Sequence, residues 1–245
     1  MKVNILDVPF DNISSIEALE RLLSFLKSDK NHLLITPNPE IVMEAQSNKL
    51  LFNIINEADL VIPDGIGIVL ASKLLKDEIK ERVAGCDLIF ELFDAIKETD
   101  ETIYLLGAKP GVAKKAQVLM EEKYKNLKIV GVHDGYFDKE EEQLIIEEIQ
   151  RLKPSVLLVE LGCPRQEEWI YRNKDILPVK ISAGIGGSID IMAGTVKRAP
   201  IIFRKLNLEW LHRIILEPSR IFRIKKIPIF LIRVIRFKEK NTEHK

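Results

Sequence analysis

The segment Asp59-Leu-Val-Ile-Pro-Asp-Gly-Ile-Gly67 indicates the fold class of this chain most directly. A short apolar strand ends at Pro63 and a helical pattern begins near Ile66, so Asp64 is expected at the carboxyl end of a strand. In open α/β sheets, ligands bind outside the carboxyl ends of the strands. Asp64 is therefore a candidate site residue, although a carboxylate just before a helix can also serve only as its cap.

The same strand–helix alternation continues on both sides of this segment. Strands are predicted at 2–6, 31–36, 59–62, 102–106, 127–132, 155–160 and 178–183. Helices are predicted at 15–28, 39–47, 66–76, 86–98, 111–124, 139–152 and 165–173. This pattern predicts an α/β fold: a Rossmann-like, mostly parallel sheet flanked by helices.

The character of the chain changes after Gly194. Residues 196–245 contain 14 Lys and Arg against four Asp and Glu, a net charge of +10, and these charges are interleaved with Ile, Leu and Phe. The whole chain has 37 residues of each sign, so residues 1–195 carry a net charge of −10. We therefore predict an α/β catalytic domain over 1–195 and a helical, basic and apolar C-terminal appendage over 196–245.

The appendage suggests contact with an anionic surface. Basic amphipathic helices lie in the membrane interface, and each basic residue near an anionic leaflet contributes about 1 kcal/mol. The alternative is a pair of terminal helices packed on the body with their charges in solvent. No apolar run approaches the roughly 20 residues that span a bilayer, and the N-terminus lacks a signal-peptide pattern. We expect a cytoplasmic protein that binds the inner membrane face peripherally, and no nucleic-acid partner, since the tail is rich in Ile.

Neither a metal nor another cofactor is expected. Cys86 and Cys163 show no zinc-binding spacing. No D-x-D triplet occurs, so the usual two-carboxylate clamp for the metal of a nucleoside diphosphate is missing. A leaving diphosphate would then be neutralised by arginines and backbone N–H groups.

Polar residues and glycines follow most of the predicted strands. In chain order, the candidates are Thr36, Asn38, Asp64, Arg82, Gly107, Tyr136, Gln166, Gly186, Gly187 and Asp190. The glycine turns at Gly107 and at Gly184–Gly187 allow close approach of a ligand, and we expect the diphosphate at one of them. This combination fits sugar transfer to a lipid-borne acceptor, because it offers one carboxylate, a basic appendage and no metal site. Asp64 would take the proton of the acceptor hydroxyl.

Several segments together resemble a known family over about residues 5–225. They are Thr36-Pro37-Asn38-Pro39-Glu40, Pro63-Asp64-Gly65, Arg82-Val83-Ala84-Gly85, His133-x-Gly135-Tyr136-Phe137, Gly162-x-Pro164-x-Gln166-Glu167-x-Trp169, Arg198-Ala199-Pro200, Leu208-Glu209-Trp210-Leu211-x-Arg213 and Glu217-Pro218-x-Arg220. This set resembles the WecG/TagA/CpsF glycosyltransferase family, and most closely its TagA branch, which acts in wall teichoic acid synthesis.

The resemblance implies transfer of N-acetylmannosamine from UDP to undecaprenyl-diphosphate-linked N-acetylglucosamine, with inversion to a β-1,4 linkage and without a metal. It implies that Asp64 is the catalytic base and that Thr36, Asn38, Arg82 and Gln166 line the pocket. Arg213, Arg220 and Arg223 resemble appendage arginines near the diphosphates. Tyr136 and the Gly186–Asp190 turn are our own candidates for the nucleoside. Residues 226–245 match no known segment and are interpreted as a membrane-contact tail.

Other interpretations stay open at this point. Relatives that transfer another UDP-hexose or UDP-N-acetylmannosaminuronic acid share most of these motifs. A dinucleotide-dependent oxidoreductase would place G-x-G-x-x-G after the first strand, whereas Asp7-Val8-Pro9-Phe10-Asp11 stands there. A noncatalytic membrane adaptor would not need so many polar residues at the ends of its strands. Off the membrane, the apolar face of 201–216 could pair two subunits.

Overall fold

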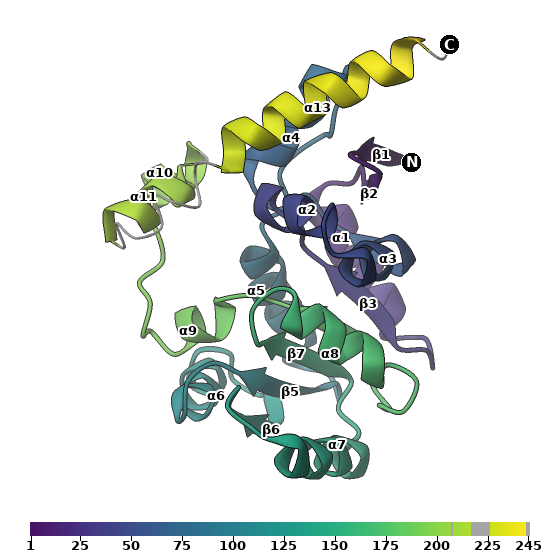
Figure 1. The fold of residues 1–245 in the computed structure, drawn as a ribbon. Coiled ribbons are helices and arrows are strands. Elements are labelled where there is room, and N and C mark those ends of the chain that lie inside the picture. Colours follow the sequence, from purple (N-terminus) through teal and green to yellow (C-terminus); the bar gives the residue numbers. More distant parts are fainter. Residues whose placement is uncertain (207, 217–225, 244–245) are drawn as a thin grey trace.

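Six parallel strands form the central sheet of the protein, in the order β4-β3-β8-β7-β5-β6 (Figure 1). The structure is a computed structural model, and it describes residues 1–206, 208–216 and 226–243. The strands are β3 (His32–Ile35), β4 (Leu60–Val61), β5 (Thr102–Gly107), β6 (Lys128–His133), β7 (Val156–Glu160) and β8 (Ile181–Gly184). The predicted parallel α/β sheet is confirmed.

Helices cover both faces of the sheet, because successive strand residues point to opposite sides. Leu33 and Ile35 enter one buried cluster, whereas Leu34 enters the other. The first cluster is completed by α2 (Pro39–Ala45), α3 (Lys49–Glu57), α4 (Ile66–Leu75), α7 (Lys139–Leu152), α8 (Arg165–Asn173) and α13 (Lys226–Glu243). The second is completed by α1 (Ser15–Phe25), α5 (Gly85–Ile96), α6 (Val112–Lys123) and α9 (Ser188–Met192).

The first predicted strand does not belong to the parallel sheet. Its residues form β1 (Lys2–Ile5), which pairs antiparallel with β2 (Val8–Asp11) in a separate hairpin. The two loop residues, Leu6 and Asp7, have φ values of 54° and 61°, as in the turns that match the twist of a hairpin. The hairpin is held to the sheet by Asp11, whose carboxylate accepts the Val61 N–H at 2.9 Å.

A helix that the sequence analysis did not predict, α3, follows α2 closely. Its cap is Asn48, whose side-chain oxygen accepts the Leu51 N–H at 3.1 Å. Its buried face contains Leu51, Ile54 and Ile55. The signal was present as an Asn before an apolar pattern at helical spacing.

The C-terminal part contains α10 (Ile201–Lys205), α11 (Glu209–Leu216) and α13. Helix α13 packs against α4 and α2 (Figure 1). Phe230 and Val234 on this helix are fully buried, and Nζ of Lys238 donates to the Leu74 carbonyl at 2.8 Å. The interpretation of 226–245 as simply a membrane-contact tail is therefore wrong for α13, because one side of this helix belongs to the core.

Candidate active site

The carboxyl ends of the six strands meet at one edge of the sheet, and most of the predicted site residues lie there. Residues 36–38 follow β3, Asp64 follows β4, and Gly186 and Gly187 follow β8. Gln166 follows β7, and Gly107 ends β5. This edge is the region where open α/β sheets bind ligands.

Asp64 lies where three chain segments are packed closely together. A Cβ atom added to Gly67 would lie 2.5 Å from the Pro39 side chain, and one added to Gly85 would lie 3.0 Å from the Thr36 side chain. The first contact is too short for any residue but glycine, and the second would require the Thr36 side chain to move by a few tenths of an ångström. The segments around Thr36, Asp64 and Gly85 are therefore held against one another.

Asp64 directly precedes the first residue of the α4 cap. The N-cap residue of α4 is Gly65, with φ of 103°. Burial raises the pKa of the Cys86 thiol at the start of α5, and the charge of the nearby Asp64 is the least of the further causes. The half-buried Asp64 carboxylate therefore lies between the starts of two helices.

Asn38, by contrast, does act as a cap. Its Oδ1 accepts the N–H groups of Glu40 and Ile41 at 2.9 and 3.0 Å, which fixes the start of α2. The side-chain oxygen of Asn38 is thereby engaged, so a ligand contact of this side chain would come from its NH₂ group.

Arg82 forms an ion pair with the C-terminal part. Its Nη2 lies 2.9 Å from Oε2 of Glu209 in α11, and the two side chains are only 13% and 19% exposed. A second ion pair joins Arg198, before α10, to Asp87 of α5 at 2.5 Å. Both pairs connect the segment 196–216 to residues beside Asp64. Arg82 is thus no simple surface charge, and Glu209 is a partner that the sequence analysis did not single out.

Gln166 is buried at the end of β8 rather than exposed to solvent. Its side chain is 3% exposed and lies against Gly184, where an added Cβ would be 2.7 Å from its Nε2. That Nε2 donates to Oε1 of Glu167 at 2.8 Å. The Oε1 of Gln166 contacts no hydrogen-bond partner among the described residues. A buried acceptor of this kind suits a ligand donor.

Glu167, which the sequence analysis left without a role, is the more deeply buried neighbour of Gln166. Burial raises the pKa of its carboxyl group, and the hydrogen bond from Gln166 opposes that rise. Glu167 therefore helps to fix the Gln166 amide in place.

The two predicted glycine turns differ in their surroundings. A Cβ on Gly107 would lie 2.2 Å from the Glu160 carbonyl oxygen, so this glycine, with φ of 133°, is required by packing. Nothing lies within 4 Å of a Cβ added to Gly186 or Gly187. The geometry therefore favours the turn at Gly186 and Gly187 as the place where a ligand can approach the backbone.

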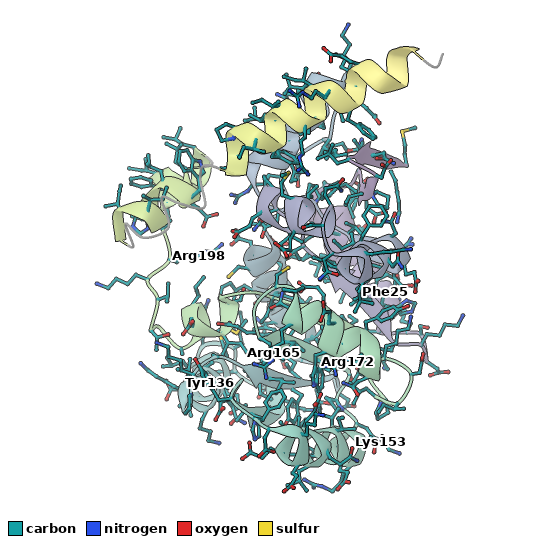
Figure 2. All side chains as sticks on the ribbon, viewed as in Figure 1. Phe25, Tyr136, Lys153, Arg165, Arg172 and Arg198 are labelled. Atoms are coloured by element: carbon teal, nitrogen blue, oxygen red, sulfur yellow. The ribbon has the colours of Figure 1, made fainter. Side chains whose placement is uncertain are left out.

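Tyr136 lies far from Asp64 in the sheet order. It follows β6, the last strand, whereas Asp64 follows β4, the first. Five strand spacings of about 4.8 Å place the two ends roughly 24 Å apart. Tyr136 is 66% exposed, beside Arg165, which donates to the Gly135 carbonyl at 3.1 Å (Figure 2). The structure separates Tyr136 from Asp64, but it places Gly135, the neighbour of Tyr136, beside Gly107: the Gly135 N–H donates to the Ala108 carbonyl at 2.9 Å.

The predicted appendage arginines are not placed. Arg213 belongs to α11, but the orientation of its side chain is outside the description. Arg220 and Arg223 lie outside the described residues. In the part of the chain that is described, no three His, Cys, Asp or Glu side chains gather as metal ligands.

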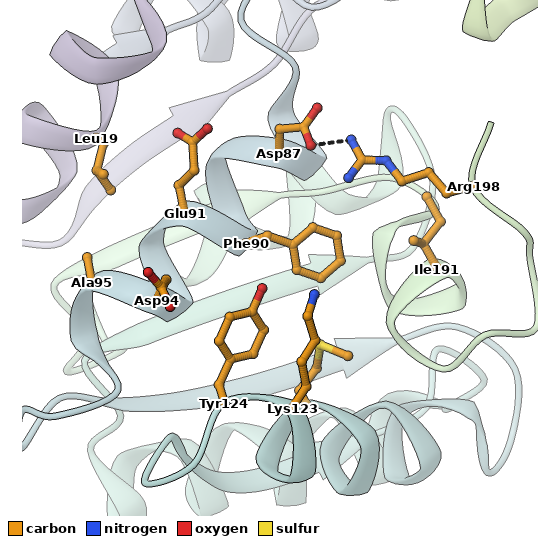
Figure 3. A pocket seen from close by; sticks show the side chains of 11 residues that line it. Leu19, Asp87, Phe90, Glu91, Asp94, Ala95, Lys123, Tyr124, Ile191 and Arg198 are labelled. Carbon is orange, nitrogen blue, oxygen red and sulfur yellow. Dashed lines mark ion pairs between the residues drawn. The ribbon is translucent and has the colours of Figure 1, made fainter. Parts of the chain in front are cut away.

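A cavity of about 720 Å³ opens next to this edge, between α5, α6 and α9 (Figure 3). Phe90 and Tyr124 face its interior, and Nζ of Lys123 lies 4.7 Å from the centre of each ring. The Arg198–Asp87 ion pair lies at the end nearest α9. The cavity thus adjoins the predicted site but does not contain Asp64.

Comparison with known proteins decides the family. The sequence profile of the glycosyl transferase WecG/TagA/CpsF family matches residues 3–244. The chain belongs to the WecG/TagA/CpsF glycosyltransferase family. It is 37% identical, over 98% of its length and 94% of theirs, to the N-acetylglucosaminyldiphosphoundecaprenol N-acetyl-beta-D-mannosaminyltransferases of Staphylococcus aureus strains MRSA252 and NCTC 8325.

Membership of the WecG/TagA/CpsF family decides against the oxidoreductase and the noncatalytic adaptor. The match also extends to residues 226–244, where the sequence analysis found no resemblance. Because α13 contributes Phe230 and Val234 to the core, this part of the chain is integral to the glycosyltransferase fold.

Proposed function

We propose that the protein transfers N-acetylmannosamine from UDP-N-acetylmannosamine to undecaprenyl-diphosphate-linked N-acetylglucosamine, forming a β-1,4 linkage with inversion. Two relatives named for this acceptor and this sugar support the assignment. The observation that carries it is the position of Asp64: a half-buried carboxylate at the sheet edge, one residue before the N-cap of α4 and close to the segment that the two ion pairs attach.

In the proposed reaction, Asp64 accepts the proton of the acceptor 4-hydroxyl as that oxygen bonds to the anomeric carbon of the donor. The bond from this carbon to the UDP oxygen breaks on the opposite face, and UDP leaves with the electron pair. A positioned general base contributes about 10²- to 10⁴-fold to such a rate. Thr36, Asn38, Arg82 and Gln166 line the pocket in this proposal.

The leaving diphosphate is neutralised, in this proposal, by arginines and backbone N–H groups instead of a metal ion. The candidates are Arg213, Arg220 and Arg223, together with the open turn at Gly186 and Gly187. Arg82 is held by Glu209 in this structure, so it contacts the diphosphate only if that ion pair rearranges.

The acceptor is borne by a lipid, and an exposed apolar surface on the C-terminal helices suits it. Among residues 1–206, 208–216 and 226–243, no helix has the length and apolar character needed to cross a bilayer. The large exposed apolar side chains of this region are Ile201, Ile202, Leu206, Trp210, Ile215, Ile229, Ile232 and Ile235, with Leu70 and Leu74 of α4. We propose that this surface contacts the inner face of the cytoplasmic membrane and that, without a membrane, it can pair two subunits.

A transfer assay tests the proposal. Purified protein is incubated with a synthetic polyprenyl-diphosphate N-acetylglucosamine and a panel of UDP-sugars, with and without EDTA. We expect turnover with UDP-N-acetylmannosamine and no loss in EDTA. Turnover with a different UDP-hexose or with UDP-N-acetylmannosaminuronic acid would reassign the donor, and a strict requirement for magnesium would contradict the metal-free chemistry.

A further inference from the structure

Three polar side-chain atoms near the start of α8 are buried without a hydrogen-bond partner among the described residues. They are Oε1 of Gln166, Oε2 of Glu167 and Nε1 of Trp169. The three residues are only 3%, 1% and 1% exposed, so bulk water does not solvate these atoms. A buried polar group that lacks a partner costs free energy, and proteins keep few of them. Because such exceptions are expected at functional sites, this end of α8 calls for a functional explanation.

Gln166 and Glu167 form a pair that fixes the orientation of the Gln166 amide. Nε2 of Gln166 donates to Oε1 of Glu167 at 2.8 Å. An ionised carboxyl group has only acceptors, so the NH₂ end of the amide must face it. The amide oxygen of Gln166 is then directed away from Glu167. This oxygen is the one that contacts no donor in the part of the chain that the structure describes.

The Gln166 amide lies at the carboxyl end of β8, in the middle of the sheet edge. A Cβ atom on Gly184, the last residue of β8, would lie 2.7 Å from Nε2 of Gln166, so this glycine leaves the space that the amide occupies. In the sheet order, β3 alone separates β8 from β4, the strand that precedes Asp64. Two strand spacings of about 4.8 Å place the ends of β8 and β4 roughly 10 Å apart. The donor and acceptor together are long enough to contact both Asp64 and Gln166.

The orientation of the Gln166 amide determines which substrate groups it can bind. Phosphate oxygens are hydrogen-bond acceptors, so they do not match Oε1 of Gln166. Hydroxyl and amide N–H groups are donors, and they do match it. A buried acceptor that loses its donor is costly, so a site built around one rejects ligands that lack the donor.

We propose that Glu167 is a positioning residue whose carboxylate turns the acceptor end of the Gln166 amide toward the substrate, where it selects a hydroxyl or amide N–H group. This inference rests on the proposed function, in which Gln166 lines the pocket. Glu167 does not itself contact the substrate, because it acts through Gln166. Without the carboxylate, the amide has two orientations, and one of them presents an NH₂ group where a substrate donor belongs.

The competing explanation is a pair that only stabilises the fold, and melting temperatures distinguish the two. Glu167→Gln keeps the size of the side chain, removes a buried charge and leaves the orientation of the Gln166 amide unfixed. The matched control is Glu168→Gln, because Glu168 is in the same first turn of α8 and its Oε1 accepts from Nδ2 of Asn48 at 3.1 Å. Both variants remove one negative charge from the start of α8. We expect Glu167→Gln to melt at or above the temperature of Glu168→Gln.

The transfer assay should give the opposite order. We expect kcat/KM to fall roughly 5- to 100-fold in Glu167→Gln, as for a buried acceptor that loses its donor, and to stay within about twofold of the wild type in Glu168→Gln. Gln166→Met removes the amide and keeps the length of the side chain. Because Glu167 acts through this amide, adding Glu167→Gln to Gln166→Met should cause no further loss. Losses that add in the double variant would overturn the inference.

Calorimetric titration and the acceptor KM identify the substrate group that Oε1 of Gln166 contacts. Weaker binding of UDP by Glu167→Gln places this group on the nucleoside. A loss confined to UDP-N-acetylmannosamine places it on the transferred sugar, and a higher KM for the acceptor alone places it on the acceptor sugar. Each of these three results supports the inference.

Failure of the inference and failure of the proposed function give different results. A lower melting temperature for Glu167→Gln than for Glu168→Gln, with kcat/KM as in the wild type, overturns the role of Glu167 and leaves the transferase intact. Absence of wild-type turnover with every UDP-sugar overturns the proposed function. In that event the affinities decide, because equal binding of UDP and of UDP-N-acetylmannosamine by Glu167→Gln and Glu168→Gln would overturn the inference as well.

Discussion

Two parts of the C-terminal region are attached to the α/β body in opposite ways. Helix α13 is held by apolar side chains, with Phe230 and Val234 fully buried against the first core. The segment carrying α10 and α11 is joined by two ion pairs, Arg82–Glu209 and Arg198–Asp87, and leaves large apolar side chains exposed. A helix whose apolar side chains are buried separates from the body only at a large cost in free energy, whereas partly solvated ion pairs are open to competition by other anions. Helix α13 is therefore structural, and the segment carrying α10 and α11 is suited to contact substrate.

The largest expected effect comes from a residue that belongs to neither attachment. Asp64→Asn should reduce kcat by about 10²- to 10⁴-fold, because the amide cannot accept the acceptor proton. The melting temperature and the affinity for UDP should stay close to those of the wild type. Activity is measured by the transfer assay and affinity by calorimetry. A rate within a few-fold of the wild type would remove Asp64 from the mechanism.

The apolar attachment is tested by Phe230→Ala. Truncating a fully buried phenylalanine typically costs about 3–5 kcal/mol of unfolding free energy, so urea unfolding should shift to much lower denaturant. The matched control is Ile232→Ala on the same helix, which is 50% exposed and should change stability by about 0.5 kcal/mol or less. Equal effects of the two variants would mean that α13 is not packed on the body.

The sequence was sufficient for the parallel sheet because apolar strands and amphipathic helices leave different periodicities. The prediction that residues 2–6 belong to the parallel sheet was wrong, because β1 pairs with β2 in a hairpin. A strand has the same apolar pattern in either arrangement. The location of Thr36, Asn38 and Asp64 at strand ends was predictable from the sequence. The contacts of Glu167 and Glu209 were not, because a charged residue reads as a surface residue until tertiary contacts bury it.

The ion-pair attachment should respond more mildly than α13. Glu209→Gln leaves the mostly buried Arg82 guanidinium without its carboxylate, and we expect a loss of about 1–3 kcal/mol in urea unfolding. The segment 196–216 should also become more accessible to trypsin. Asp100→Asn, which breaks the exposed Lys128–Asp100 pair, should have no measurable effect. Exchange of the two charges, Arg82→Glu with Glu209→Arg, should restore part of the stability but not the activity, because Arg82 lines the proposed pocket.

The smallest expected effect concerns the exposed surface that the ion-paired segment leaves open. Ile202 is 70% exposed on α10, and Ile16 is 71% exposed on α1, so the two residues differ in location but hardly in accessibility. If α10 enters the membrane interface, Ile202→Ser should weaken binding to anionic vesicles by roughly 1–2 kcal/mol, or about 5- to 30-fold, as measured by co-sedimentation. Ile16→Ser should leave vesicle binding unchanged. Equal vesicle binding by both variants and the wild type would show that the apolar surface does not contact the membrane. It would favour contact between two subunits, which gel filtration of the same three proteins would detect.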